Sequence, residues 1–120
     1  MSRFEIGRFT FELAFRELSD DRGLAIQVFG PTASGAEEVL RFDCFEKTPH
    51  YHLGWSYRQA PFVPIAAADP FGWAVAQIGE HINTLLKQAD AHEMNESELT
   101  LLAKVLTEIE TSGRALRDAA

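Results

Sequence analysis

Apolar and polar side chains alternate along residues 8–18, RFTFELAFREL, and this pattern constrains the fold more than any other feature of the chain. A period of two over this length is typical of a β-strand with one buried and one exposed face. We expect this strand to cover residues 4–18, because Phe4 and Ile6 extend the apolar pattern toward the N-terminus. The side chains expected on its buried face are Phe9, Phe11, Leu13 and Phe15.

Three further strands are expected after it. Segments rich in Gly, Pro, Ser and Asp separate them, and such residues are typical of turns. The connections are too short for a βαβ crossover, which favours an antiparallel meander. The expected strands cover residues 24–29, 37–46 and 50–57. The segments between them are SDDRG at 19–23, GPTASG at 30–35 and KTP at 47–49.

Two amphipathic helices are predicted in the second half of the chain. Asp69 followed by Pro70 is a helix start signal, and Asn95 with Glu98 three residues later has the spacing of a capping box. Each segment carries one apolar stripe, which needs the apolar face of the sheet as a partner. The expected helices cover residues 70–89 and 96–117. We therefore predict a single α+β domain of residues 1–120: a four-stranded antiparallel meander with two C-terminal helices packed on one face.

Composition restricts the classes of partner. The chain has 120 residues, 46% of them hydrophobic, and a net charge of −7. This acidic balance argues against a nucleic-acid partner or a membrane surface. The N-terminus lacks the apolar run of a signal peptide, and no segment has the length and hydrophobicity of a membrane span. Cys44 is the single cysteine, so no intrachain disulfide can form, and we expect a cytoplasmic protein.

The segment RFDCFEKTPHYHLGW, residues 41–55, carries the ionisable residues of the expected hairpin. A turn near residues 46–49 would place Asp43 opposite His52 and Arg41 opposite Gly54. Cross-strand partners point to the same side of a sheet. The residues expected on the helix-free face are Arg41, Asp43, Phe45, His50 and His52. Those expected on the face under the helices are Leu40, Phe42, Cys44, Tyr51, Leu53 and Trp55.

Four interpretations of the ionisable group remain open at this stage. It can be the solvated side of an antiparallel sheet, or an interface with a second copy of the chain. It can be a small catalytic site with His52 as base, Asp43 orienting it and Arg41 holding an anion. It can also be a metal site, since His50 and His52 beside Asp43 offer two nitrogens and an oxygen.

The string LRFDCFEKTPHYH, followed by DPFGWAVAQI, resembles a bacterial family of small uncharacterised proteins. The matching positions are Arg41–Phe45, Pro49–His52, Asp69, Pro70 and Trp73, and the resemblance covers roughly residues 40–86. Because that family has no assigned activity, the resemblance implies no function.

A looser likeness links the same segment to the toxin members of some bacterial toxin–antitoxin pairs. Those proteins also carry an Arg–aromatic–Asp strand followed by Pro-His and further histidines. Here Gly54, Trp55 and Ser56 stand where the histidine-rich continuation would be. This likeness implies a ribonuclease-like enzyme that uses Arg41, Asp43, His50 and His52.

The leading hypothesis from the sequence is a small bacterial protein without enzymatic activity, a homodimer or interaction module that associates through its polar sheet face. The alternative is a small hydrolase or ribonuclease-like toxin in which Arg41, Asp43, His50 and His52 are the catalytic candidates. No P-loop, GxGxxG, GxSxG or HExxH motif is present, so no cofactor or metal is expected. The sequence identifies neither a substrate nor a partner protein.

Overall fold

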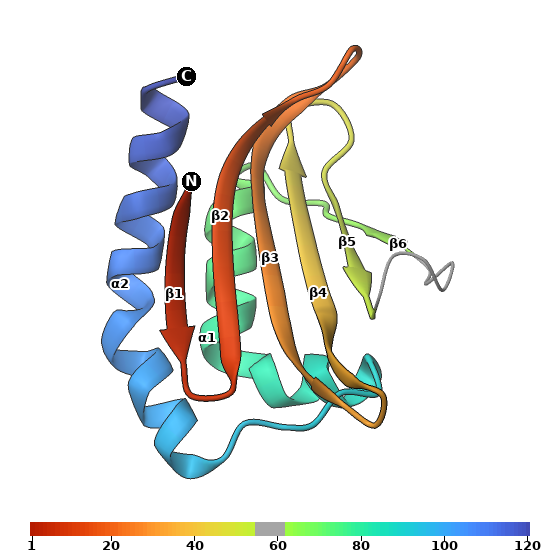
Figure 1. Cartoon of the computed structure of the whole chain (residues 1–120). Coiled ribbons are helices and arrows are strands. Elements are labelled where there is room, and N and C mark those ends of the chain that lie inside the picture. The colour runs from red at the N-terminus through yellow and green to blue at the C-terminus, as the bar shows by residue number, and fades with distance from the viewer. Residues whose placement is uncertain (55–61) are drawn as a thin grey trace.

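The computed structural model describes residues 1–54 and 62–120. It combines a sheet with two helices (Figure 1). Trp55 and the end of the strand expected at 50–57 lie outside the described residues. The strands are β1 (Ser2–Ile6), β2 (Phe9–Glu17), β3 (Arg22–Thr32), β4 (Gly35–Phe45), β5 (His50–Leu53) and β6 (Phe62–Pro64). The helices are α1 (Pro70–Gln88) and α2 (Glu96–Asp118).

The sheet has six antiparallel strands in the order of the sequence, so the prediction of a four-stranded meander was wrong. One added strand comes from the segment 4–18, which is a hairpin and not one strand. Its apolar residues change phase at the turn: Phe4 and Ile6 are even-numbered, whereas those from Phe9 onward are odd-numbered. Gly7 takes the left-handed conformation that the turn requires (φ 61°), and Phe4 then pairs with Phe11.

The second added strand is β6, which has three residues and contains a proline. A strand this short carries no readable alternation, and proline is confined to sheet edges, which is where β6 lies. The expected loop at 30–35 was also too long. β3 continues to Thr32 and β4 begins at Gly35, with the Thr32 hydroxyl donating to the Gly35 carbonyl across the turn (2.8 Å).

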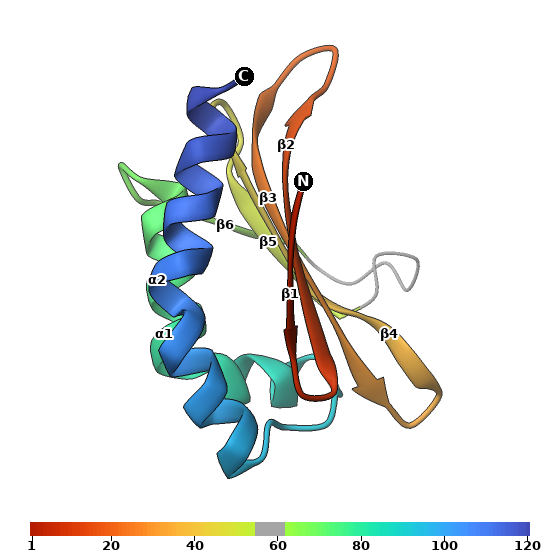
Figure 2. The ribbon, with the colours of Figure 1, turned by 60° about the vertical axis from the view of Figure 1, so that its left-hand side comes forward.

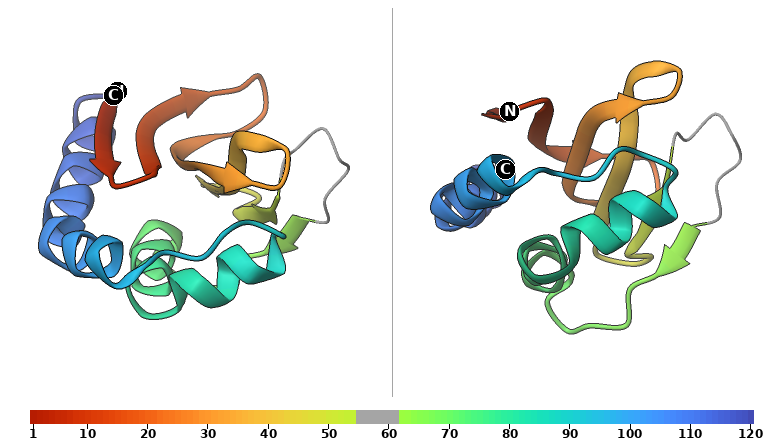
Figure 3. Two further views of the ribbon diagram at one scale, coloured as in Figure 1. Left: turned by 60° about the horizontal axis from the view of Figure 1, so that its bottom comes forward. Right: turned by 90° about the horizontal axis from the view of Figure 1, so that it is seen from below.

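Both predicted helix starts are confirmed. The Asp69 carboxylate accepts a hydrogen bond from Gly72 N (3.2 Å), and Asn95 with Glu98 forms the reciprocal capping box. The first helix is not straight, however. His81 has non-helical angles (φ −135°, ψ 23°), and α1 changes direction there, as both views of Figure 3 show.

The helices cover one face of the sheet, with α1 packed on β4 and α2 on β1 and β2 (Figure 2). Between the two layers lies an apolar core that includes Phe9, Phe11, Phe42 and Ile78. Cys44 lies on this core face as predicted, and burial, with added repulsion from nearby carboxylates, raises the pKa of its thiol to about 12. Among the described residues, neither helix has the length and apolar character needed to cross a membrane.

Glu98 is a buried acid, with 4% of its surface exposed, and it links α2 to the β1–β2 turn. Its carboxylate accepts hydrogen bonds from Arg8 N (2.7 Å), Arg8 Nη2 (2.8 Å), Arg8 Nε (3.1 Å) and Asn95 N (2.9 Å). These hydrogen bonds, first those from the Arg8 side chain, lower the pKa of Glu98 to about 2. The same carboxylate lies so close to Gly7 that a Cβ there would overlap it. A buried acid is thus fully paired at this point.

Candidate functional site

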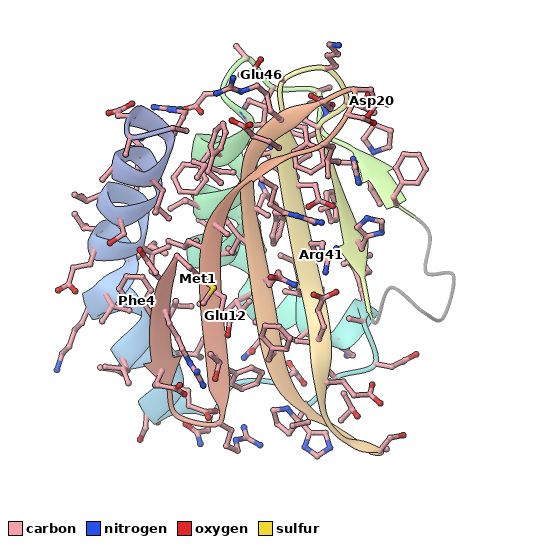
Figure 4. The ribbon with its side chains drawn as sticks, turned by 45° about the horizontal axis from the view of Figure 1, so that its top comes forward. Met1, Phe4, Glu12, Asp20, Arg41 and Glu46 are labelled. Atoms are coloured by element: carbon pink, nitrogen blue, oxygen red, sulfur yellow. The ribbon has the colours of Figure 1, made fainter. Side chains whose placement is uncertain are left out.

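Two adjacent rows of side chains cross the helix-free face of the sheet, which Figure 4 shows with Glu12 of β2 and Arg41 of β4 labelled. Cross-strand partners share a face, so the strand register defines each row. The first row consists of Arg3, Glu12, Gln27, Arg41, His52 and Phe62. The second row consists of Ala14, Ala25, Asp43, His50 and Pro64. All four candidate residues of the sequence analysis therefore lie on this face.

The register between β4 and β5 differs from the expected one. Asp43 pairs with His50 and Arg41 pairs with His52, whereas we expected Asp43 opposite His52 and Arg41 opposite Gly54. The shift is two residues, and because side chains alternate with a period of two, the face is unchanged.

The loop between β4 and β5 explains the shift. Its backbone groups bind outside the hairpin: Lys47 N and Thr48 N donate to the two carboxylate oxygens of Asp21 (both 2.9 Å). Glu46 N likewise donates to the Arg22 carbonyl (2.9 Å). This loop is therefore held by the β2–β3 turn, and the tight turn that the sequence suggests does not form.

A β-bulge in β4 adds Glu38 to this face, where the sequence analysis did not place it. The register slips by one residue between Val28 and Phe29, so that Val28 pairs with Leu40 and Phe29 with Glu38. The extra residue, Val39, is buried in the core. Bulges re-aim side chains in this way. Glu38 is 7% exposed and accepts hydrogen bonds from Gln27 Nε2 (2.6 Å) and Arg41 Nη2 (2.9 Å).

Asp43, His50 and His52, which we call the Asp43 cluster, form the centre of the face. His50 Nε2 lies 3.2 Å and His52 Nε2 lies 3.5 Å from the same carboxylate oxygen, Asp43 Oδ2. The side chain of Asp43 is 5% exposed, and those of His50 and His52 are 17% and 21% exposed. Three potential ligand atoms, all within 4.8 Å of one another, thus converge from two neighbouring strands.

The hydrogen bond of His50 to the backbone fixes which of its two ring nitrogens faces Asp43. His50 Nδ1 lies 2.8 Å from the Thr48 carbonyl oxygen, which only accepts, so Nδ1 carries the proton. In the neutral ring Nε2 is then a bare acceptor directed at a carboxylate oxygen. Two acceptors 3.2 Å apart repel unless a proton or a metal ion lies between them. Metal-binding histidines characteristically donate their second N–H to a backbone carbonyl in this way.

Burial keeps the second imidazole in the form that binds metal. Burial lowers the pKa of His52 below its usual value, the neighbouring His50 lowers it further, and Asp43 only partly opposes them. Neutral imidazole is the form that coordinates metal ions. His52 therefore offers a free nitrogen at neutral pH.

The two spacings from the imidazoles to Asp43 match a metal coordination sphere, and all three ligand atoms lie within 4.8 Å of one another. Two ligands each about 2.1 Å from a tetrahedral ion lie about 3.4 Å apart. The two observed spacings to Asp43 Oδ2 are 3.2 and 3.5 Å. Two imidazoles and one carboxylate suit Zn²⁺ or, with a facial arrangement, Fe²⁺. The residues of the cluster thus fit a divalent transition-metal ion.

Two buried carboxylate oxygens on this face have no hydrogen-bond partner among the described residues: Glu38 Oε1 and Asp43 Oδ1. Such atoms are rare in folded proteins because each costs the free energy of its lost hydration. Arg16 Nη1 is 3.9 Å from Asp43 Oδ1, which is ion-pair distance and too long for a hydrogen bond. The face therefore holds negative charge that its own side chains only partly satisfy.

A cavity of about 350 Å³ lies elsewhere, at the end of the sheet on the helix side. Its lining includes Phe15, Cys44, Phe71 and Arg117. Cys44 is the residue after Asp43 but points to the opposite side, so this cavity does not open on the Asp43 cluster.

The profile of a domain of unknown function, DUF7700, matches residues 3–113. This result agrees with the resemblance to an uncharacterised family, and the toxin likeness remains a prediction. A search of curated proteins and a search of solved structures each found no match.

Proposed function

Since the chain belongs to the DUF7700 family, whose function is unknown, we propose from the geometry of the site that it is a metal-binding protein. Asp43, His50 and His52 bind one divalent transition-metal ion on the helix-free face of the sheet. The proposal rests on one observation: Nε2 of His50, whose Nδ1 donates to the Thr48 carbonyl, is directed at a carboxylate oxygen 3.2 Å away, a contact that needs a proton or a metal ion between the two atoms. This revises the expectation, drawn from missing motifs, that the protein takes no metal.

Two features of the cluster support this proposal further. Three protein ligands leave at least one coordination position open, as in catalytic zinc sites and unlike closed structural sites. The ligands also come from paired strands, which hold side chains more rigidly than loops do. The site is therefore suited to a bound ion that also contacts a second molecule.

The metal-free catalytic hypothesis has less support than the metal site. It requires Arg41 to hold an anion without the added charge of a metal ion, but the carboxylate of Glu38, which accepts from Arg41 Nη2 (2.9 Å), already offsets the charge of that guanidinium. It also requires Asp43 to orient His52 as a base, but Asp43 Oδ2 lies nearer to His50 (3.2 Å) than to His52 (3.5 Å). Hydrolase activity in the metal-free protein is thus the weaker alternative.

Metal binding is tested by titrating zinc into metal-free protein in a calorimeter and by following thermal unfolding. We expect one ion per chain, and zinc at 100 times its dissociation constant should stabilise the fold by about 2.7 kcal/mol. Replacing a ligand, in His52→Ala or Asp43→Asn, should weaken binding by at least about 100-fold, because even the outer partners of metal ligands contribute about 10–100-fold.

The matched control is His92→Ala. His92 is exposed, and the hydrogen bond from its backbone N–H to the Pro31 carbonyl survives the substitution. Equal losses in the His92 and His52 variants would show non-specific binding to surface histidines. Stoichiometric binding in Asp43→Asn would overturn the assignment of the cluster.

The prediction of a homodimer remains untested, and one observation favours it. Phe62, at the sheet edge beside both imidazoles, is 56% exposed, and a second copy could cover it. Light scattering after size-exclusion chromatography gives the mass directly. A dimer that becomes monomeric in Phe62→Ser supports association through this face, and a monomeric wild type rules it out at the concentration measured.

A further inference from the structure

We propose that the metal ion in the Asp43 cluster binds a small oxyanion, a carboxylate or a phosphonate-type group, and that Phe62 selects oxyanions with an attached apolar ring. This inference rests on the proposed function, because without the ion the face has no excess positive charge.

The charges of the face explain why anion binding depends on the metal. The two carboxylates of Glu38 and Asp43 are matched by the two guanidinium groups of Arg41 and Arg16. Without metal these four charges offset one another. Arg3 and Glu5 of β1 pair with each other, and Glu12 adds one negative charge to the face, in a chain whose net charge is −7. A divalent ion gives the face a positive excess, and an anion then becomes its natural counter-charge.

Both arginines flank the cluster from different sides. Arg41 pairs with the ligand His52 across β4 and β5, and its bonds to Glu38 use Nε and Nη2, two of the nitrogens of a group with five N–H donors. Arg16 approaches the other side of Asp43 and is 39% exposed. It reaches from β2 across β3, where the intervening residues are Gly23 and Ala25. Guanidinium groups beside a metal ion are suited to binding carboxylate and phosphate oxygens.

Phe62 gives this site an apolar side. Its ring centroid lies 5.1 Å from that of His50 and 6.3 Å from that of His52, yet the residue is 56% exposed. An aromatic group on the ligand could cover the exposed part of this ring and gain both burial and ring stacking. The fit is therefore better for benzoate than for acetate.

The experiment uses Co²⁺ in place of zinc, because its visible spectrum reports changes in coordination. The cobalt-loaded protein is titrated with acetate, benzoate and phenylphosphonate. We expect saturable spectral changes with all three, and at least about 5-fold tighter binding of benzoate than of acetate. Phe62→Ala should remove this preference and leave acetate binding unchanged.

Arginine variants test the electrostatic part. Arg16→Gln and Arg41→Gln should each weaken anion binding by at least about 5-fold, measured at cobalt concentrations that saturate the metal site of each variant. Arg117→Gln is the matched control, since Arg117 lies on α2 on the other side of the sheet and pairs with Asp118 at 3.8 Å.

The outcomes separate this inference from the proposed function. Failure of cobalt to bind overturns both. Cobalt binding with a spectrum that none of the three anions changes overturns the oxyanion inference alone. A preference for acetate over benzoate overturns the role of Phe62, and a preference between benzoate and phenylphosphonate identifies which oxyanion the site takes.

Discussion

Two acidic side chains are equally inaccessible in this protein but have opposite surroundings. Glu98 is 4% exposed and Asp43 is 3% exposed. Glu98 accepts four hydrogen bonds, from Arg8 and Asn95. Asp43 instead has side-chain nitrogens of His50, His52 and Arg16 at 3.2–3.9 Å and an oxygen without a hydrogen-bond partner among the described residues. A fully paired acid stabilises a fold, and an incompletely paired one retains the capacity to bind a ligand. Burial alone therefore does not separate a structural acid from a functional one.

The largest effect on stability is expected for Glu98→Ala. This change removes the capping box of α2 and the hydrogen bonds from Arg8, and we expect a loss of about 2–3 kcal/mol in the free energy of unfolding. Urea denaturation monitored by circular dichroism measures it. A loss below about 0.5 kcal/mol would show that the pairing of Glu98 contributes little, and the comparison with Asp43 would then fail.

The pH dependence of stability should reflect the same carboxylate. The folded-state pKa of Glu98 is about 2, below its unfolded value, so its contribution is fully present above about pH 4.5. The contribution should be lost as the pH falls from about 4.5 toward 2. Comparing urea midpoints at pH 7 and pH 3 for wild type and Glu98→Gln tests this. The variant should lose less stability than wild type over that interval, and parallel curves would assign acid sensitivity to other groups.

Gly7→Ala tests the same pairing of Glu98 by changing the β1–β2 turn that contacts it. Gly7 has φ 61°, and an added Cβ would come within 2.5 Å of the Glu98 side chain. We expect a loss of about 1–2 kcal/mol, from backbone strain and displacement of the carboxylate. The exposed Gly35 has positive φ but open space around it, so Gly35→Ala isolates the backbone part. Equal losses in the two variants would mean that the contact with Glu98 contributes nothing.

The smallest effect on stability is expected for Asp43→Asn in the absence of metal, with a change below about 1 kcal/mol. The amide introduced by this substitution can donate to Nε2 of a neutral His50 ring, a bond that an ionised carboxylate cannot make. Denaturation in EDTA measures the difference. With zinc present the order should reverse, since only wild type gains stability from the ion. A loss above about 2 kcal/mol in EDTA would make Asp43 a structural acid like Glu98.

Local signals predicted much of the fold but not the number of strands. Helix starts depend on neighbours a few residues apart, so Asp69 and Asn95 identified both. The change of apolar phase across Gly7 and Arg8 was readable in the sequence and would have revealed the β1–β2 hairpin. β6 could not be predicted from the sequence. Its three residues include a proline and show no alternation, and they form a strand only because they pair with β5.

The candidate site was predictable in part for the same reason. Alternation placed Arg41, Asp43, His50 and His52 on one face even though the assumed register was wrong by two residues. Glu38 was missed because the bulge at Val39 depends on contacts with β3, and a sequence pattern does not show where an extra residue will be accommodated. The tautomer of His50 likewise depends on the position of the Thr48 carbonyl.

The bulge at Val39 reverses the alternation of side chains between the two faces of β4. Residues after it present odd-numbered side chains to the open face, and residues before it present even-numbered ones, as with Glu38. Any attempt to graft this polar surface onto another sheet must therefore transplant the interruption together with the side chains. In a regular strand with the same sequence, either the side chain of Glu38 or those of Arg41 and Asp43 would point into the apolar core.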